Sequence, residues 1–311
     1  MKKVLITGAT SMLGLALVNE CIENDTSVYA IVRRETARRN RLPKSNLLHV
    51  VECNLDELSS LNLDEYGFDA FYHFSWEATN NKSRNIVDAQ NRNINYTLDA
   101  VRLASRIGSG KFIGAGSQAE YGRVSGSIST DAKVSPDSAY GIAKYAAGRL
   151  AGILCDQIGL QFIWTRIFSI YGVGDMSSTM IMYVIAALLK GEKPLLTSCK
   201  QQWDYLNCKD AARAFFLVGT KGKSQIYNIG SGATQPLIQY VRLIRDTINK
   251  DLPLGIGELP YDSKQVMYLC ADIANLIQDT GFKPMIKFED GISETVDWYK
   301  NYVLIGKDGS K

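Results

Sequence analysis

The first half of the chain alternates short apolar runs with longer segments in which apolar residues recur at helical spacing. The apolar runs predict strands at residues 4–6, 27–32, 47–51, 70–74, 111–115 and 162–168. The longer segments predict helices at 13–23, around 55–61, at 87–106 and from about 140 to 158. Strands that alternate with helices indicate βαβ units. We therefore predict an α/β protein with a Rossmann-type, doubly wound parallel sheet.

The pattern changes beyond about residue 170, where prolines interrupt the chain and the expected elements become short. Helices are predicted at 180–189, 207–218, 234–248, 272–280 and 290–302, with a short strand at 226–229. Residues 1–170 are therefore expected to form a dinucleotide-binding domain, with a return segment near 203–230. Residues 171–311 are expected to form mainly a smaller, mixed substrate lobe.

A glycine turn follows the first predicted strand and opens the first predicted helix. Gly8 allows the chain to turn tightly, and Gly14 allows the helix to pack close to the strand. The N–H groups of the helix N-terminus can then face a pyrophosphate. Ser11 replaces the middle glycine of this G-x-x-G-x-x-G pattern, and its side chain can either crowd a diphosphate or donate a hydrogen bond to it. The turn as a whole predicts a dinucleotide site.

Two arginines follow the second predicted strand, at the position that distinguishes the two dinucleotides. An acid there would bind a ribose 2′-hydroxyl and select NAD, whereas Arg33 and Arg34 suit a 2′-phosphate. The sequence therefore favours NADP, with NAD as the alternative. A solvated basic loop is the other interpretation, because further arginines follow at positions 38, 39 and 41.

Tyr140 and Lys144 are spaced to lie on one face of a helix, one turn apart. An ammonium close to a phenol favours the phenolate, so we expect Lys144 to lower the pKa of Tyr140 and to make it an acid/base at neutral pH. Ser117 comes just after a predicted strand, at the edge where open parallel sheets bind ligands. These three residues predict the catalytic site of an enzyme that transfers a hydride.

These motifs resemble those of the extended short-chain dehydrogenases/reductases, in particular the NAD-dependent epimerase/dehydratase kind that modifies nucleotide sugars. The resemblance covers nearly the whole chain. It includes the glycine turn, the Ser117, Tyr140 and Lys144 set, a helix asparagine at Asn93, and signatures at 204–206, 210–212 and 227–232. It implies a nucleotide-diphosphate sugar bound between the two lobes, with chemistry at C4 of the sugar.

The resemblance also implies which residues contact each ligand. Besides Tyr140 and Lys144, cofactor contacts are expected from Gly8, Thr10, Ser11, Met12, Leu13, Gly14, Arg33, Arg34, Asn54, Leu55, Phe74, Ser75, Asn93 and Ile167. Substrate contacts are expected from Trp76, Gln118, Ser169, Met180 and Trp203. Four positions depart from the family pattern, with Ser169 in place of asparagine, Val173 of proline, Trp203 of arginine and Asn54 of aspartate.

Three reactions of this family share a first hydride step, and the residues after Ser117 help to separate them. Relatives that dehydrate a sugar carry an Asp–Glu pair there, whereas this chain has Gln118 and Ala119, which argues against dehydration. Because Arg33 and Arg34 favour exchangeable NADPH, the main hypothesis is an NADPH-dependent reductase of an NDP-4-keto-6-deoxy sugar. The alternative is an NDP-sugar 4-epimerase with tightly bound NAD, and a further alternative is a non-catalytic NAD(P)-binding sensor.

Composition narrows the setting of this chemistry. The 311 residues carry a formal charge of +3 without a basic stripe, so no nucleic acid is expected as a partner. Six scattered cysteines and two histidines offer no metal site, and His73 is expected to be a packed structural residue. No apolar run is long enough for a membrane span or a signal peptide.

We expect a cytoplasmic protein. The resemblance implies a homodimer that pairs through the helices at 87–106 and 140–158, with cell-surface polysaccharide synthesis as the usual setting.

Overall fold

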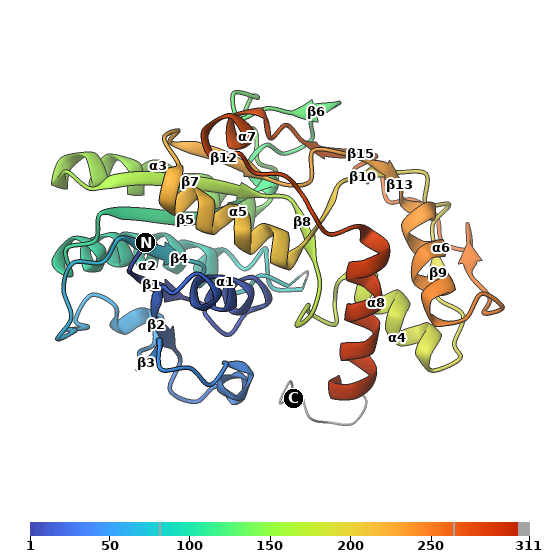
Figure 1. Ribbon diagram of the computed structural model, residues 1–311. Coiled ribbons are helices and arrows are strands. Elements are labelled where there is room, and N and C mark those ends of the chain that lie inside the picture. The colour runs from blue at the N-terminus through green and yellow to red at the C-terminus, as the bar shows by residue number, and fades with distance from the viewer. Residues whose placement is uncertain (81, 264, 304–311) are drawn as a thin grey trace.

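The structure, a computed structural model, describes residues 1–80, 82–263 and 265–303. Its largest part is a seven-stranded parallel sheet with the strand order β12-β7-β5-β4-β1-β2-β3. The strands are β1 (Lys3–Thr7), β2 (Ser27–Val32), β3 (Leu48–Glu52), β4 (Ala70–His73), β5 (Lys111–Ser117), β7 (Gln161–Ile167) and β12 (Ile226–Ile229). The chain runs outward from β1 to β3 and then returns to β4 on the other side of β1 (Figure 1). The carboxyl ends of β1 and β4 therefore form the switch point, where open parallel sheets bind ligands.

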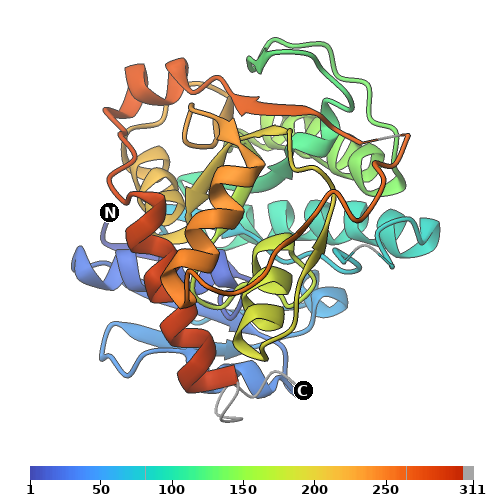
Figure 2. The same ribbon diagram turned by 90° about the vertical axis from the view of Figure 1, so that its right-hand side faces the viewer.

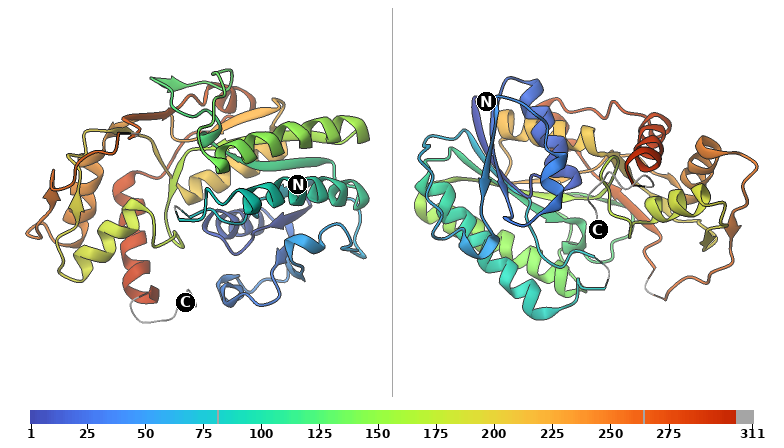
Figure 3. Two further views of the ribbon diagram at one scale, coloured as in Figure 1. Left: turned by 180° about the vertical axis from the view of Figure 1, so that it is seen from behind. Right: turned by 90° about the horizontal axis from the view of Figure 1, so that it is seen from below.

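Helices cover both faces of this sheet. On one face α1 (Met12–Glu23) packs against α5 (Cys208–Lys221), and on the other α2 (Val87–Arg106) packs beside α3 (Ala139–Ile158) (Figure 3). Val4, Leu5 and Ile6 in β1 are fully buried, as expected for a parallel strand with helices on both sides. The predicted Rossmann-type, doubly wound α/β fold is confirmed.

The second half of the chain adds a smaller lobe of mixed structure. Three helices pack around an apolar cluster (Figure 2): α4 (Met180–Leu189), α6 (Leu237–Ile248) and α8 (Phe288–Trp298). A mixed sheet in the order β13-β10-β15-β6 joins β13 (Gln235–Pro236), β10 (Gln202–Trp203), β15 (Tyr268–Ala271) and β6 (Ser127–Ile128). Two short pairs complete the strands, namely β8 (Ser169–Tyr171) with β11 (Tyr205–Asn207) and β9 (Leu195–Leu196) with β14 (Gly255–Ile256). Positions 304–311, the end of the expected lobe, lie outside the described residues.

Several predicted helices have different bounds in the structure. The helix expected around 55–61 is only a 3-10 turn, η2 (Leu55–Glu57). The Glu57 side chain accepts a hydrogen bond from the Asn54 N–H at the start of this turn. The helix expected at 234–248 begins only at Leu237, because Pro236 has no N–H to donate and disfavours a helical residue before it. The helix expected at 272–280 is α7 (Ala274–Thr280), and the one expected at 290–302 is α8 followed by a π-helical turn, η4 (Tyr299–Val303).

Two general features of the chain bear on its chemistry. All six cysteines are buried and free of disulfides. Within the described ranges, no helix combines the length and the apolar character needed to cross a bilayer.

Candidate active site

Two glycines shape the turn between β1 and α1. Gly8 has a φ of +71°, and a Cβ there would lie 2.9 Å from the backbone nitrogen of Ser75. A Cβ on Gly14 would overlap the carbonyl oxygen of Gly8. Both positions therefore require glycine, and the turn lies directly against the end of β4.

Ser11 forms the N-cap of α1. Its hydroxyl accepts a hydrogen bond from the Gly14 N–H (3.1 Å) and donates one to the Gly8 carbonyl (2.8 Å). The hydroxyl is thus hydrogen-bonded within the turn rather than directed toward a diphosphate. An N-cap of this kind contributes about 1 kcal/mol to the stability of the fold. The first N–H groups of a helix have no acceptor within the helix, so they can donate to a bound phosphate. The two glycines leave space for a dinucleotide pyrophosphate to approach these groups.

Ser117, Tyr140 and Lys144 come together at the carboxyl end of β5. Ser117 ends the strand, its Oγ accepts a hydrogen bond from the Ala119 N–H (3.2 Å), and its side chain acts to lower the pKa of the Tyr140 phenol. Tyr140 lies in the first turn of α3, and Lys144 follows one turn later as a buried residue. The Lys144 ammonium donates to the carbonyl oxygen of Ala115 (2.5 Å).

Trp76, expected to contact the substrate, lies against this catalytic pair. Lys144 Nζ is 3.6 Å from the centre of the indole ring, and the Tyr140 ring packs edge to face with the indole at 6.1 Å. The indole Nε1 donates to Gln90 Oε1 (2.9 Å), and Gln90 in turn donates to the Ala78 carbonyl (3.0 Å). The sequence analysis did not identify Gln90 as a residue of the site. Its position three residues before Asn93 on α2 was the available signal, because residues at this spacing lie on the same face of a helix.

The charges around Tyr140 differ from the expectation. Burial lowers the pKa of Lys144 to about 7. Burial also raises the pKa of Tyr140, and the hydrogen bond with Ser117 and the charge of Arg84 act against that rise. The guanidinium carbon of Arg84 lies 4.8 Å from the centre of the Tyr140 ring, whereas Lys144 Nζ lies 5.8 Å away. The pKa of Tyr140 is thus raised overall, and the Lys144 ammonium is directed at a backbone carbonyl and an indole ring.

His73 is buried beside the site. Its Nδ1 is hydrogen-bonded to Thr7 Oγ1 (3.0 Å), and its ring packs near those of Phe71 and Phe112. Burial and, to a smaller degree, the charge of Lys144 lower the pKa of His73 to about 3. The imidazole is therefore neutral and part of the packed core.

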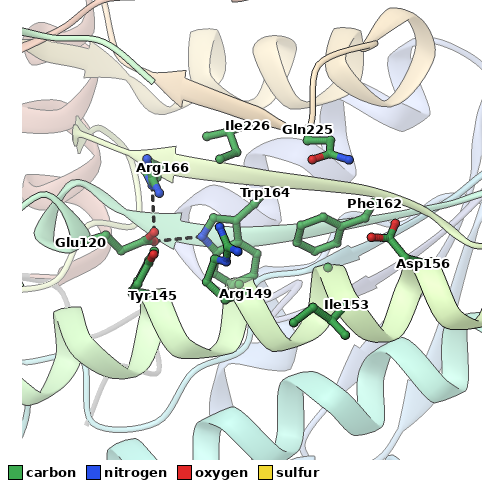
Figure 4. A pocket seen from close by; sticks show the side chains of 12 residues that line it. Glu120, Tyr145, Arg149, Ile153, Asp156, Phe162, Trp164, Arg166, Gln225 and Ile226 are labelled. Atoms are coloured by element: carbon green, nitrogen blue, oxygen red, sulfur yellow. Dashed lines mark hydrogen bonds and ion pairs between the residues drawn. The ribbon is translucent and has the colours of Figure 1, made fainter. Parts of the chain in front are cut away.

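Glu120 holds the loop behind Ser117. Its buried carboxylate accepts hydrogen bonds from the Ser117 N–H, the Trp164 indole and the Arg166 guanidinium, each at 2.9 Å. Figure 4 shows the last two of these contacts. A cavity of about 150 Å³ opens beside this cluster between α3 and β7, and the three residues expected to be catalytic do not line it. The capping-box spacing from Ser117 to Glu120 was the sequence signal for this support.

Asn93, expected to contact the cofactor, binds protein backbone in this structure. Its Oδ1 accepts a hydrogen bond from the Glu77 N–H (2.8 Å), and its Nδ2 donates to the carbonyls of Glu77 (3.1 Å) and Ala89 (3.0 Å). Both amide hydrogens are used, so this buried side chain ties α2 to the segment that follows β4.

The arginines expected to bind a 2′-phosphate are exposed, and Arg34 is already paired. Its Nη1 lies 2.5 Å from the Glu57 carboxylate, which also accepts a hydrogen bond from the Asn54 N–H (3.0 Å). Arg33 is exposed beside it. A 2′-phosphate would therefore compete with Glu57 for Arg34.

Two of the departures from the family pattern contact each other on the substrate side. Trp203 Nε1 donates to Ser169 Oγ (2.8 Å), which joins β10 to β8.

The remaining residues expected at the ligands lie as follows. Gln118 lies in η3 (Gln118–Glu120), and Met180 is the first residue of α4. The other residues expected at the ligands are partly exposed, namely Thr10, Met12, Leu13, Leu55, Phe74, Ser75 and Ile167.

Comparison with known proteins adds an independent line of evidence. A sequence model of the NAD dependent epimerase/dehydratase family matches residues 4–230. A dTDP-glucose 4,6-dehydratase of Haemophilus influenzae is 24% identical, over 96% of this chain and 98% of its own. Two solved structures are similar over 96% of this chain. They are a UDP-N-acetylglucosamine 4-epimerase from Methanobrevibacter ruminantium (TM-score 0.86, 23% identity, 98% of its chain) and a UDP-glucuronic acid 4-epimerase from Bacillus cereus in complex with NAD (0.84, 19%, 97%). At these identities the structural likeness establishes the shared fold.

Proposed function

Because the chain belongs to the NAD-dependent epimerase/dehydratase family, we propose that it is a nucleotide-diphosphate-sugar 4-epimerase that keeps NAD bound. The observation that carries this proposal is the convergence of Ser117, Tyr140 and Lys144 at the end of β5, with no acid in the next two positions. Two proteins of similar fold are UDP-sugar 4-epimerases, and one of them holds NAD, which supports the same assignment.

The proposed reaction assigns one role to each catalytic residue. The glycine turn would hold the pyrophosphate of NAD, and Lys144 would hold its nicotinamide ribose. When bound, NAD supplies a hydride acceptor and donor. Tyr140, as the phenolate, takes the proton of the sugar 4-hydroxyl and later returns a proton to the same oxygen. Ser117 Oγ holds that oxygen within reach, so that C4 passes through a ketone and regains a hydroxyl of the opposite configuration.

The two other family reactions have less support. Dehydration needs an additional acid/base pair, which Gln118 and Ala119 do not supply, and the carboxylate of Glu120 is already bonded by three donors. The NADPH-dependent reductase favoured by the sequence depended on Arg33 and Arg34, and the Arg34–Glu57 pair weakens that argument. Substrate binding between the two lobes remains part of the proposal, with Trp203 and Ser169 facing the sugar nucleotide.

We also propose a homodimer formed through α2 and α3. Ile142, Leu150 and Ile153 are 54%, 44% and 51% exposed on α3, and their spacing places them on one side of the helix. Exposed apolar residues grouped in this way favour a partner surface. Light scattering of the purified protein is expected to give twice the chain mass, and a monomer for Ile142→Glu/Ile153→Glu.

The test of the epimerase is the identity of the bound dinucleotide together with turnover of UDP-sugars followed by NMR at C4. The expected result is stoichiometric NAD released on denaturation, interconversion of 4-epimers without added cofactor, and loss of turnover in Tyr140→Phe. Consumption of added NADPH with one product would support the reductase instead. Tight NAD binding without turnover of any nucleotide sugar would support the sensor.

A further inference from the structure

Arg84 provides the cation nearest to the ring of Tyr140. Its guanidinium carbon lies 4.8 Å from the ring centre, closer than the 5.8 Å to Lys144 Nζ. The Lys144 ammonium is held by the Ala115 carbonyl and the face of Trp76 instead. The cation nearest to the ring centre therefore comes from the loop after β4, outside the Tyr-x-x-x-Lys motif.

Hydrogen bonds anchor the chain segment that carries Arg84. The side chain of its neighbour Asn85 accepts a hydrogen bond from the Ala139 N–H (3.1 Å) at the start of α3. On α2, which follows this loop, Gln90 and Asn93 bind Trp76 and the backbone at Glu77 and Ala78, as described above. Among the described residues, Arg84 Nε is buried and has no hydrogen-bond partner, and the guanidinium contacts the Tyr140 ring.

A cation over a phenol ring favours ionisation of that phenol. The neutral ring attracts the guanidinium through its quadrupole, but a phenolate attracts it through a full negative charge. The other polar groups near Tyr140 are the Ser117 hydroxyl from β5, Lys144 on its own helix and the Glu120 carboxylate from η3. Glu120 opposes ionisation of Tyr140, although its charge is balanced by Arg166. His73 from β4 faces Lys144 and is neutral.

We propose that Arg84 is a positioning residue that stabilises the phenolate of Tyr140 from the face of its ring. Trp76 complements it by holding the Lys144 ammonium away from that face. The catalytic consequence, easier formation of the phenolate that acts as the base, depends on the proposed epimerase function, whereas the effect on Tyr140 ionisation does not.

The direct test is a titration of Tyr140 in the protein as purified. Tyrosine labelled with ¹³C at Cζ is followed by NMR from neutral to alkaline pH, and the signal absent in Tyr140→Phe identifies the residue. Arg84→Met and Arg84→Gln are expected to raise the midpoint by about one pH unit, while Arg84→Lys stays close to the unchanged protein. Arg92→Met is the matched control, because Arg92 pairs with Glu77 on the exposed side of the same segment. An unchanged midpoint in Arg84→Met and Arg84→Gln, or an equal shift in Arg92→Met, would overturn the proposal.

A pH profile separates this inference from the proposed function. With an epimerised UDP-sugar as substrate, Arg84→Gln is expected to lose about tenfold in kcat at neutral pH and to recover as the pH rises, with little change in KM. A pH-independent loss would overturn the proposal. If no nucleotide sugar is turned over, the epimerase assignment fails, and the NMR titration still decides the role of Arg84.

Discussion

Two buried charged groups flank Ser117, and they are compensated to different degrees. Behind the serine, the Glu120 carboxylate receives three hydrogen bonds, one of them from Arg166, whose side chain is also buried. On the other side, the Lys144 ammonium has one backbone carbonyl and an indole face, and its pKa falls to about 7 through burial.

The difference separates support from reactivity. A buried ion whose partners satisfy it is rigid and hard to titrate, and it serves to hold its neighbours in place. A buried ion with few partners remains close to changing its protonation state at neutral pH, which is typical of functional sites. The predictions below test this contrast.

The largest effect is expected at the compensated pair. Glu120→Gln or Arg166→Met removes one charge and leaves the other buried, which should cost about 3–5 kcal/mol of unfolding free energy in urea. The double variant should recover part of that loss, because no unpaired charge remains. Arg123→Met, at the exposed Arg123–Asp137 pair, is the control and should change stability by less than about 1 kcal/mol. Single variants that cost no more than this control would contradict the structural role.

The opposite sign is expected at the poorly compensated lysine. Lys144→Met should abolish turnover yet raise the unfolding free energy by about 2 kcal/mol at pH 7, because a costly buried charge is removed. The pKa of Lys144 is lowered from 10.5 to about 7 in the fold. In the unchanged protein its contribution to stability is therefore present above pH 10.5 and is lost as the pH falls toward 7. Urea titrations at several pH values should show this slope disappear in Lys144→Met, and a less stable variant would refute the contrast.

A smaller effect is expected from the neutral histidine next to Lys144. The pKa of His73 is lowered from 6.5 to about 3, so the unfolded chain takes up a proton that the fold excludes. The contribution of His73 to stability is present above pH 6.5 and falls with pH, by about 1 kcal/mol at pH 5.5. The difference in unfolding free energy between His73→Gln and the unchanged protein should narrow by this amount between pH 7.5 and 5.5. A constant difference would mean that His73 takes up its proton in the fold as readily as in the unfolded chain.

The smallest effect is expected at the exposed pair near the predicted adenosine end. Glu57→Gln releases Arg34 and should raise the affinity for NADP⁺ relative to NAD⁺ by about threefold, measured by calorimetry on the apo protein. Glu52→Gln, at the exposed Arg39–Glu52 pair, is the matched control. Equal ratios in the two variants would show that Arg34 does not reach the cofactor.

Prediction from the sequence succeeded where residues act on close neighbours. Apart from the helix expected around 55–61, the strands and helices of the first half follow local periodicity. The requirement for glycine at Gly8 and Gly14 reflects their own turn. The helix at 234–248 was misjudged at its start, because apolar periodicity outweighed the effect of Pro236. Asn93 was assigned to the cofactor by resemblance, and its amide is used by backbone that the sequence cannot place beside it.

The sequence by itself determined most strands and helices of the sheet domain, the glycine turn at Gly8 and Gly14, and the position of Tyr140 and Lys144 one helical turn apart. Each of these features depends on spacings of a few residues. The tertiary structure alone decided what surrounds that pair. Arg84 and Trp76 lie in the loop after β4, and the charge of Glu120 is neutralised by an ion pair with Arg166 of β7. Charges and rings act through space over several ångströms, so their effect on Tyr140 is set by how separate segments pack and exclude water.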